Sequence, residues 1–232
     1  MIVLGIETST ARSSVALVVD GECVAQEVHE DARGHGAFLA PAMRLCLSAI
    51  PSPPGSVDAV AVGVGPGLYT GLRVGMATAA AFCSARALPI VGCSGLDTLA
   101  QSDAARIARD GDLLVTTIDA RRGQVFWAVH RREGGSSRLL DGPHVGSPAD
   151  FEQVLHRPAH DGAVHVIGEV GAEEIVRPDA VDTARCAVPV LAAEPWDTLT
   201  PQALAPVYLR EADVRIGWTE RGGVRVGGGT DR

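Results

Sequence analysis

The sequence predicts an α/β protein made of two similar lobes with a cleft between them. Each half of the chain begins with an apolar strand that ends in an acid, Glu7 in the first half and Asp119 in the second. In each half a turn and antiparallel strands follow. Because ligands of such sheets lie at the carboxyl ends of the strands, we expect both acids at the cleft.

The elements of the first half follow from hairpin signals, apolar periodicity and proline breaks. Asp20-Gly21 is a strong signal for a two-residue hairpin. The proline-rich segment 51–55 ends a helix with apolar residues at helical spacing, and Pro89 halts a second, alanine-rich helix. The expected elements are strands 2–7, 14–19, 23–28, 57–64 and 88–93 and helices 35–50 and 76–87.

The second half is expected to begin near residue 95, so that residues 1–95 form the first lobe and residues 96–215 the second. A helix-like run is expected after Gly168, and the glycine-rich tail 216–232 has no apolar period and is expected to be disordered. The expected elements are helices 94–109, 148–155 and 202–210, the last interrupted by Pro206, strands 113–119, 124–131 and 164–167, and a surface turn at 134–137.

Length and composition indicate a globular protein. The chain has 232 residues, of which 46% are hydrophobic and 21% charged. No apolar run approaches the ~18–20 residues of a membrane span, and no basic leader is present. Five cysteines without C-x-x-C spacing predict buried thiols in a reducing cytosol and argue against a zinc site. We therefore expect a cytoplasmic protein with no membrane segment.

Charge excludes several function classes. The formal net charge of −8 argues against strong direct binding to tRNA or DNA, because nucleic-acid binders carry a basic face. The chain has no lysine, so a Walker lysine, a kinase-type strand lysine and a Schiff-base lysine are all absent.

A glycine-rich loop, residues 65–75, follows an apolar strand and opens into a helix, which is the geometry that presents backbone N–H groups to an anion. Thr70 is expected as the N-cap. Arg73 lies in the first turn, where the helix dipole disfavours a cation, so we expect either a nearby acid or anion, or a solvated side chain. The candidate anion site, vestigial or intact, consists of Glu7, Thr8, Ser9, Thr10, Gly65, Gly67, Thr70, Arg73 and Asp119. Asp119 could instead cap the turn before Gly123, and we favour that role.

The same loop allows a second hypothesis, an interface between helices. Gly71, Gly75, Ala79 and Cys83 recur every four residues and form a small-residue ridge. Such a ridge could pair with helices of another subunit, or could pack on the chain's own sheet. The expected interface residues are His35, Phe38, Leu39, Ala42, Leu45, Cys46, Gly71, Leu72, Gly75, Ala79, Phe82 and Cys83.

Neither a metal site nor a nucleophile stands out. His35 has Leu39 four residues later, and a single imidazole is a poor metal site, so a place near the start of the first helix is expected for it. His156 and His160 are separated by Pro158, which indicates a surface loop. Ser94 is expected to cap the next helix.

Five motifs resemble one family. In order, they lie at residues 6–10, 14–17, 65–75, 119–125 and 206–210. Together they resemble the TsaB (YeaZ) family of bacterial tRNA threonylcarbamoyladenosine biosynthesis proteins, within the TsaD-like, or glycoprotease, superfamily. The resemblance implies the actin-like fold of sugar kinases and Hsp70, which contains ribonuclease H-like lobes.

The resemblance also implies a function. A family member pairs through its two helices with TsaD, and with itself when TsaD is absent. TsaD carries the metal and transfers the threonylcarbamoyl group to adenosine 37 of tRNAs reading codons that begin with A. The ATPase TsaE and the enzyme TsaC complete the pathway, so ATP, ADP and metal belong to the partner subunits and tRNA is met only through the complex.

Two departures fit the non-catalytic role that the resemblance implies. Ser9 occupies the place of the glycine that active actin-like ATPases have after their first strand, and Leu39 replaces the second histidine of the TsaD metal pair. An autonomous actin-like ATPase or kinase stays open as an alternative, and a metallopeptidase as a third.

Overall fold

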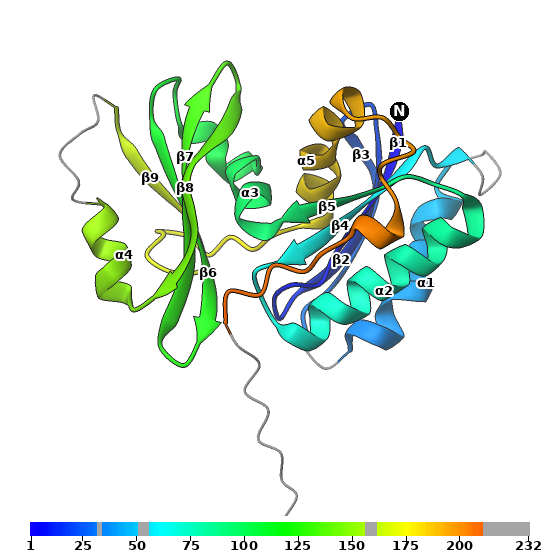
Figure 1. The fold of residues 1–232 in the computed structure, drawn as a ribbon, viewed down its shortest axis with the longest axis horizontal. Helices are drawn as coiled ribbons and strands as arrows, with labels where there is room; N and C mark the ends of the chain where they lie inside the picture. Colours follow the sequence, from blue (N-terminus) through cyan, green and yellow to red (C-terminus); the bar gives the residue numbers. More distant parts are fainter. Residues whose placement is uncertain (32–33, 51–55, 156–161, 211–232) are drawn as a thin grey trace, which may run out of the picture.

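Two sheets form the cores of two lobes that lie side by side (Figure 1). The computed structural model describes residues 1–31, 34–50, 56–155 and 162–210. Among these residues we find no helix that is both long and apolar enough to cross a membrane.

The first lobe is built on a five-stranded sheet with the order β3-β2-β1-β4-β5. Strand β1 pairs antiparallel with β2 and parallel with β4. Asp20 and Gly21 both have positive φ, and they form the expected hairpin turn between β2 and β3. This mixed order is that of an actin-like, ribonuclease H-like lobe, so the expected fold class is confirmed. The strands are β1 (Ile2–Glu7), β2 (Ser13–Val19), β3 (Glu22–His29), β4 (Ala59–Gly65) and β5 (Ile90–Ser94).

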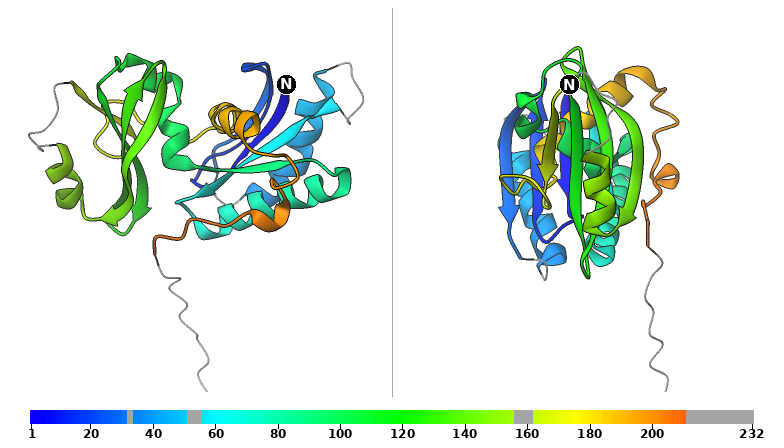
Figure 2. Two further views of the ribbon diagram at one scale, coloured as in Figure 1. Left: turned by 45° about the horizontal axis from the view of Figure 1, so that its top comes forward. Right: turned by 90° about the vertical axis from the view of Figure 1, so that its left-hand side faces the viewer.

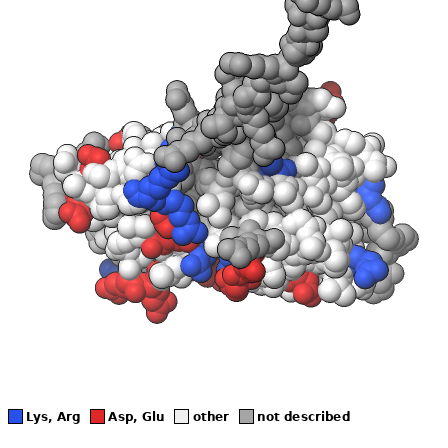
Figure 3. All heavy atoms as spheres, turned by 90° about the horizontal axis from the view of Figure 1, so that it is seen from below, with Lys and Arg blue, Asp and Glu red and all other residues white. Residues whose placement is uncertain are grey.

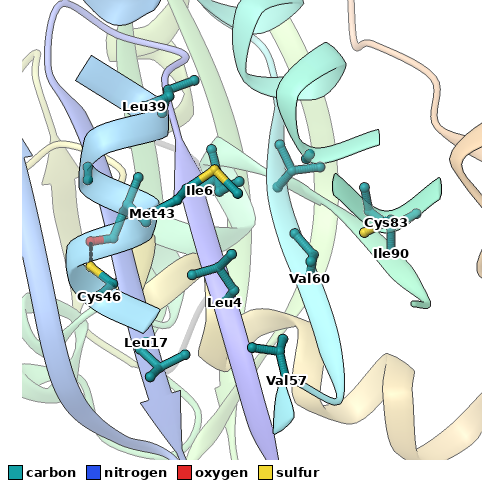
Figure 4. Packing of buried hydrophobic residues seen from close by; sticks show 14 of the residues in the cluster. Leu4, Ile6, Leu17, Leu39, Met43, Cys46, Val57, Val60, Cys83 and Ile90 are labelled. Carbon is teal, nitrogen blue, oxygen red and sulfur yellow. Dashed lines mark hydrogen bonds between the residues drawn. The ribbon is translucent and has the colours of Figure 1, made fainter. Parts of the chain in front are cut away.

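Helices cover both faces of this sheet, because successive strand residues point to opposite sides. Leu4 and Ile6 pack with α1 (His35–Ser48) and α2 (Tyr69–Arg86), as Figure 4 shows. Val3 points the other way, into a cluster with α5 (Ala180–Ala193), which Figure 2 shows on the opposite face. A Cβ on Gly5 would overlap the carbonyl oxygen of Ala180, so glycine is required there for α5 to approach.

Helix α5 corrects the expected lobe boundary. Residues 180–193 pack on the first sheet, and the segment after them stays with that lobe. Ile90 N donates to Leu199 O at 2.9 Å, and Val207 N donates to Val64 O at 2.8 Å. The assignment of residues 96–215 to one lobe is therefore wrong for residues 180–207, which pack on the first lobe, whereas Leu209 and Arg210 contact the second lobe again. The tail 216–232 lies outside the described residues.

The second lobe has a four-stranded sheet in the order β8-β7-β6-β9, sandwiched between two short helices. Leu96 and Leu99 of α3 pack on one face, and Phe151 of α4 packs on the other. The elements are α3 (Gly95–Ala100), a 3₁₀ helix (Asp103–Ile107), β6 (Leu113–Arg121), β7 (Gln124–Glu133), β8 (Ser136–Gly146), α4 (Pro148–Leu155) and β9 (Val164–Gly168).

Several expected elements differ from the structure. The helix expected at 94–109 divides into α3 and the 3₁₀ helix, and the run expected after Gly168 becomes helical only at Ala180. The helix expected at 202–210 is wrong: a 3₁₀ turn (Pro201–Ala203) is followed by extended chain that bonds to β4. The surface turn expected at 134–137 leads directly into β8, a strand that the sequence pattern did not indicate.

Candidate functional site

Glu7 ends β1 as expected, but its side chain is completely buried. Its carboxyl accepts from Ser9 N at 2.7 Å and from the Thr183 hydroxyl of α5 at 3.3 Å. A Cβ on Gly63 would overlap this carboxyl group, so the neighbouring strand leaves just enough room for it. Burial raises the pKa of Glu7 above the ordinary range of a glutamate. The acid is therefore a member of the core rather than a ligand exposed at a cleft.

The loop after β1 packs directly on the glycine loop. Leu68 N donates to Ser9 O at 2.6 Å, and the Thr8 hydroxyl donates to Gly71 O at 2.8 Å. A Cβ on Gly67 would overlap Ser9 O, and one on Gly71 would overlap Thr8 O. These glycines allow two backbones to touch, which is a different role from the phosphate cradle that the sequence suggested for Gly67.

The residues at this place do not fit a nucleotide phosphate. Thr8 and Ser9 are fully buried, and Thr10 is nearly so. On the second-lobe side, Ile118 and Pro178 pack against Gly95 close to the Ser9 hydroxyl. Gly65 has positive φ and its Cα faces the Leu72 side chain and the Val207 carbonyl, so it too is enclosed by protein.

Asp119 has the structural role that we favoured. Its carboxylate accepts from Arg121 N at 2.7 Å and pairs with the Arg121 guanidinium at 3.1 Å. Arg121, Arg122 and Gly123 all have positive φ, so the turn between β6 and β7 needs such a side-chain acceptor. The Asp119 carboxylate is thus directed to its own turn.

Arg73 contacts two aromatic side chains rather than an acidic one. Its guanidinium lies 3.9 Å from the centre of the Tyr69 ring, and its Nε donates to the Tyr208 hydroxyl at 3.3 Å. The two tyrosine rings are 5.2 Å apart and both are exposed. Thr70 is not the N-cap, because α2 already begins at Tyr69 after Leu68. Sequence reasoning missed this cluster because Tyr208 was expected in a helix.

His35 begins α1, as expected, and is buried. Its Nδ1 contacts the Ser13 hydroxyl, and burial lowers the pKa of its imidazole. Within the described ranges, no three metal-binding side chains come together. His156 and His160 lie outside those ranges.

The small-residue ridge faces the chain's own sheet. Ala79 and Cys83 belong to the core with Leu4 and Ile6, and a Cβ on Gly75 would overlap the Thr8 hydroxyl. The expectation that these side chains meet another subunit is therefore wrong, because they are already buried in the monomer. The expected interface residues that are buried are His35, Leu39, Ala42, Cys46, Gly71, Leu72, Gly75, Ala79 and Cys83.

The outward surface of α1 and α2 carries a different apolar set. Of the expected residues, Leu45 is 51% exposed, and Phe38 and Phe82 are half-buried. Between the helices lies an apolar groove of about 650 Å³, which we call the α1–α2 groove. It is lined by Ala40, Met43, Arg44, Leu47, Ser48, Ile50, Thr78, Phe82 and Arg86.

A polar cavity of about 440 Å³ lies at the junction of the lobes and was not foreseen. Arg12 reaches Asp179 at 3.2 Å there, and Arg185 reaches Asp103 of the second lobe at 3.3 Å. Burial, reinforced by Asp179, raises the pKa of the Asp182 carboxyl to about 7. The pair between Arg185 and Asp103 joins α5 of the first lobe to the second lobe.

Comparison with known proteins places the chain in a family. The family model described as TsaD, tRNA N6-adenosine threonylcarbamoyltransferase, matches residues 22–177. The protein named TsaB of Haemophilus influenzae is 33% identical over 172 residues, which cover 70% of each chain. The chain belongs to the TsaB (YeaZ) family. TsaB of Bacillus subtilis is 27% identical over 231 residues, covering 95% of this chain and 99% of that one.

A solved structure supports the TsaB assignment. YeaZ from Pseudomonas aeruginosa matches with a TM-score of 0.77 and 26% identity, covering 90% of this chain and 99% of that one. An uncharacterized protein of Mycobacterium leprae is 36% identical over 92% of this chain, but the chain spans only 56% of that protein. An uncharacterized protein of Mycobacterium tuberculosis is 34% identical, and 93% of its length is covered.

The first test concerns the ridge. Gly75→Leu should lower the free energy of unfolding by about 1–3 kcal/mol, because the new side chain must displace Thr8. Ala77→Leu, on the exposed side of the same helix, is the matched control and should change stability by less than about 0.5 kcal/mol. Urea denaturation measures both. Unchanged stability of Gly75→Leu would contradict the assignment of the ridge to the core.

The second test concerns the buried acid. Because the pKa of Glu7 is raised in the folded chain, the folded state holds this proton more tightly than the unfolded state. Stability from this group is full below about pH 4.3, the ordinary pKa of glutamate, and is lost as the pH rises toward the folded-state pKa.

The native chain should therefore lose stability relative to Glu7→Gln as the pH rises from about 4 to about 8. Chemical denaturation of both proteins across this range measures the difference. Glu22→Gln, at an exposed position, is the control, and its free energy of unfolding should change with pH as that of the native chain does. Parallel curves for the native chain and Glu7→Gln would show that folding does not raise the pKa of Glu7.

Proposed function

We propose that this chain is the non-catalytic subunit of the complex that forms N6-threonylcarbamoyladenosine at position 37 of tRNAs reading codons that begin with A, and that it binds and activates TsaD. Relatives named as tRNA threonylcarbamoyladenosine biosynthesis proteins support the pathway. The subunit role rests on a contrast between two places in the first lobe. The loop after β1, which we call the former cleft, is buried, whereas the outward side of α1 and α2 is apolar and exposed.

The closed cleft argues against independent catalysis. A phosphate-transfer site needs donors and a cation placed where charge develops. Here Thr8 and Ser9 are buried, Glu7 is a core residue with a raised pKa, and Asp119 is tied to Arg121. We infer that ATP, ADP and metal are bound by the partner subunits and that none is held tightly by this chain alone.

The α1–α2 surface has the character of a docking site. A contiguous apolar patch on a soluble protein marks an interaction surface, and interface cores are rich in aromatic residues and methionine. Leu45 stands exposed on α1, and Met43, Leu47 and Phe82 line the groove beside it. Seen from below, the half of the molecule formed by the first lobe is mostly neutral, while acidic groups gather mainly over the other half (Figure 3).

The same surface explains the wider assembly that we propose. TsaD occupies the α1–α2 surface in a heterodimer, TsaE joins the pair, and tRNA is met through the complex. In the absence of TsaD, two copies of this chain pair through the same helices. The α/β core holds α1 and α2 in place, since α1 packs on β2 and β3 and α2 packs on β4.

Docking is tested at the most exposed leucine. Leu45→Asp should raise the dissociation constant for TsaD of the same organism at least about tenfold, because a charge would be buried at the contact. The variant should keep its melting temperature, since Leu45 is 51% exposed. Isothermal titration calorimetry and a melting curve give both quantities.

Leu139→Asp is the control, because Leu139 is 42% exposed on β8 of the other lobe. It should bind TsaD as the native chain does. Failure of the native chain to form any complex with TsaD, with or without nucleotide, would refute the proposal.

The absence of catalysis is tested separately. The purified chain should neither hydrolyse ATP nor bind it tightly, because the donors of the former cleft are enclosed by protein. A coupled ATPase assay and equilibrium dialysis measure the two properties. Turnover that disappears in Glu7→Ala would favour an autonomous ATPase instead.

A further inference from the structure

Helices α1 and α2 differ in charge from the rest of the chain. Residues 35–48 and 69–86 contain no aspartate or glutamate and three arginines, Arg44, Arg73 and Arg86. The chain as a whole has a formal net charge of −8. Its excess of acid therefore lies entirely outside the two helices that form the proposed docking surface.

Two of these arginines, Arg44 and Arg86, line the apolar groove. Arg44 is exposed on α1, and Arg86 lies at the end of α2 with its guanidinium 4.8 Å from the centre of the Phe82 ring. The residues that line the α1–α2 groove include both arginines and no carboxylate. The α1–α2 groove therefore has an apolar floor and a positively charged rim.

We propose that the α1–α2 groove selects a partner whose facing surface is a helix with acidic residues beside its apolar side chains, and that Arg44 is the main selecting residue. This inference rests on the proposed function. The apolar floor fits an amphipathic helix laid into a groove, and the rim adds charge complementarity. A cation on a partly desolvated rim discriminates against partners that bring another cation to it.

The same arrangement weakens pairing with a second copy. In a two-fold symmetric dimer the same patch serves both subunits, so each α1–α2 surface would face another that carries only positive charge. Pairing with itself is therefore the weaker of the two associations. Added salt should weaken binding to TsaD, because it screens the attraction between opposite charges. It should not weaken self-association, because there it screens repulsion between like charges.

The experiment measures binding of the native chain to TsaD of the same organism at about 50 mM and about 500 mM NaCl, where the screening length differs severalfold. We expect the dissociation constant to rise at least about tenfold at the higher salt concentration. Arg44→Glu should raise it about tenfold or more at low salt, Arg44→Lys should restore most of the affinity, and neither should shift the melting temperature.

Arg109→Glu is the matched control, because Arg109 is exposed in the second lobe, between the 3₁₀ helix and β6, and the substitution should leave binding unchanged. Analytical ultracentrifugation of the chain alone should show self-association that does not weaken as salt is added.

The outcomes separate the two proposals. Absence of any TsaD complex overturns the proposed function and this inference with it. If a complex forms but its dissociation constant changes neither with salt nor in Arg44→Glu, the charge selection is overturned and the proposed function stands. Self-association tighter than TsaD binding at low salt overturns the selection as well.

Discussion

The contact between the loop after β1 and the first turn of α2 determines which surfaces of the first lobe are buried and which stay exposed. The Thr8 hydroxyl donates to the Gly71 carbonyl, and the Leu68 amide donates to the Ser9 carbonyl. Glycines at positions 67 and 71 allow the two backbones to approach this closely. This contact encloses the end of β1 and fixes where α2 starts. It therefore encloses the candidate anion site that the sequence suggested, while the outer surfaces of α1 and α2 stay exposed.

The second constraint is the return of the chain through α5. The Thr183 hydroxyl reaches the buried carboxyl of Glu7, and Gly5 admits the start of α5 against β1. Ion pairs from Arg12 and Arg185 then connect this helix to both lobes. A single helix thus completes the core of the first lobe, encloses its acid and anchors the junction, so the two lobes are not independent units.

Local patterns in the sequence were sufficient for much of the fold. The Asp20-Gly21 hairpin, the first-half strands and the turn capped by Asp119 all depend on near neighbours, and all are confirmed. The orientation of α1 and α2 did not follow, because both helices are apolar on two sides and periodicity alone cannot tell which side meets the sheet. Contacts between distant residues, such as Arg73 with Tyr208 and α5 with β1, leave no local signal at all.

The late position of α5 also has a consequence for biosynthesis. One face of the first sheet, with Val3, Ala59 and Val91, is covered by residues that end at Leu191. A ribosome has therefore made most of the chain before the N-terminal lobe can bury that face. Such long-range closure slows folding and leaves these apolar strands uncovered in the nascent chain until α5 emerges.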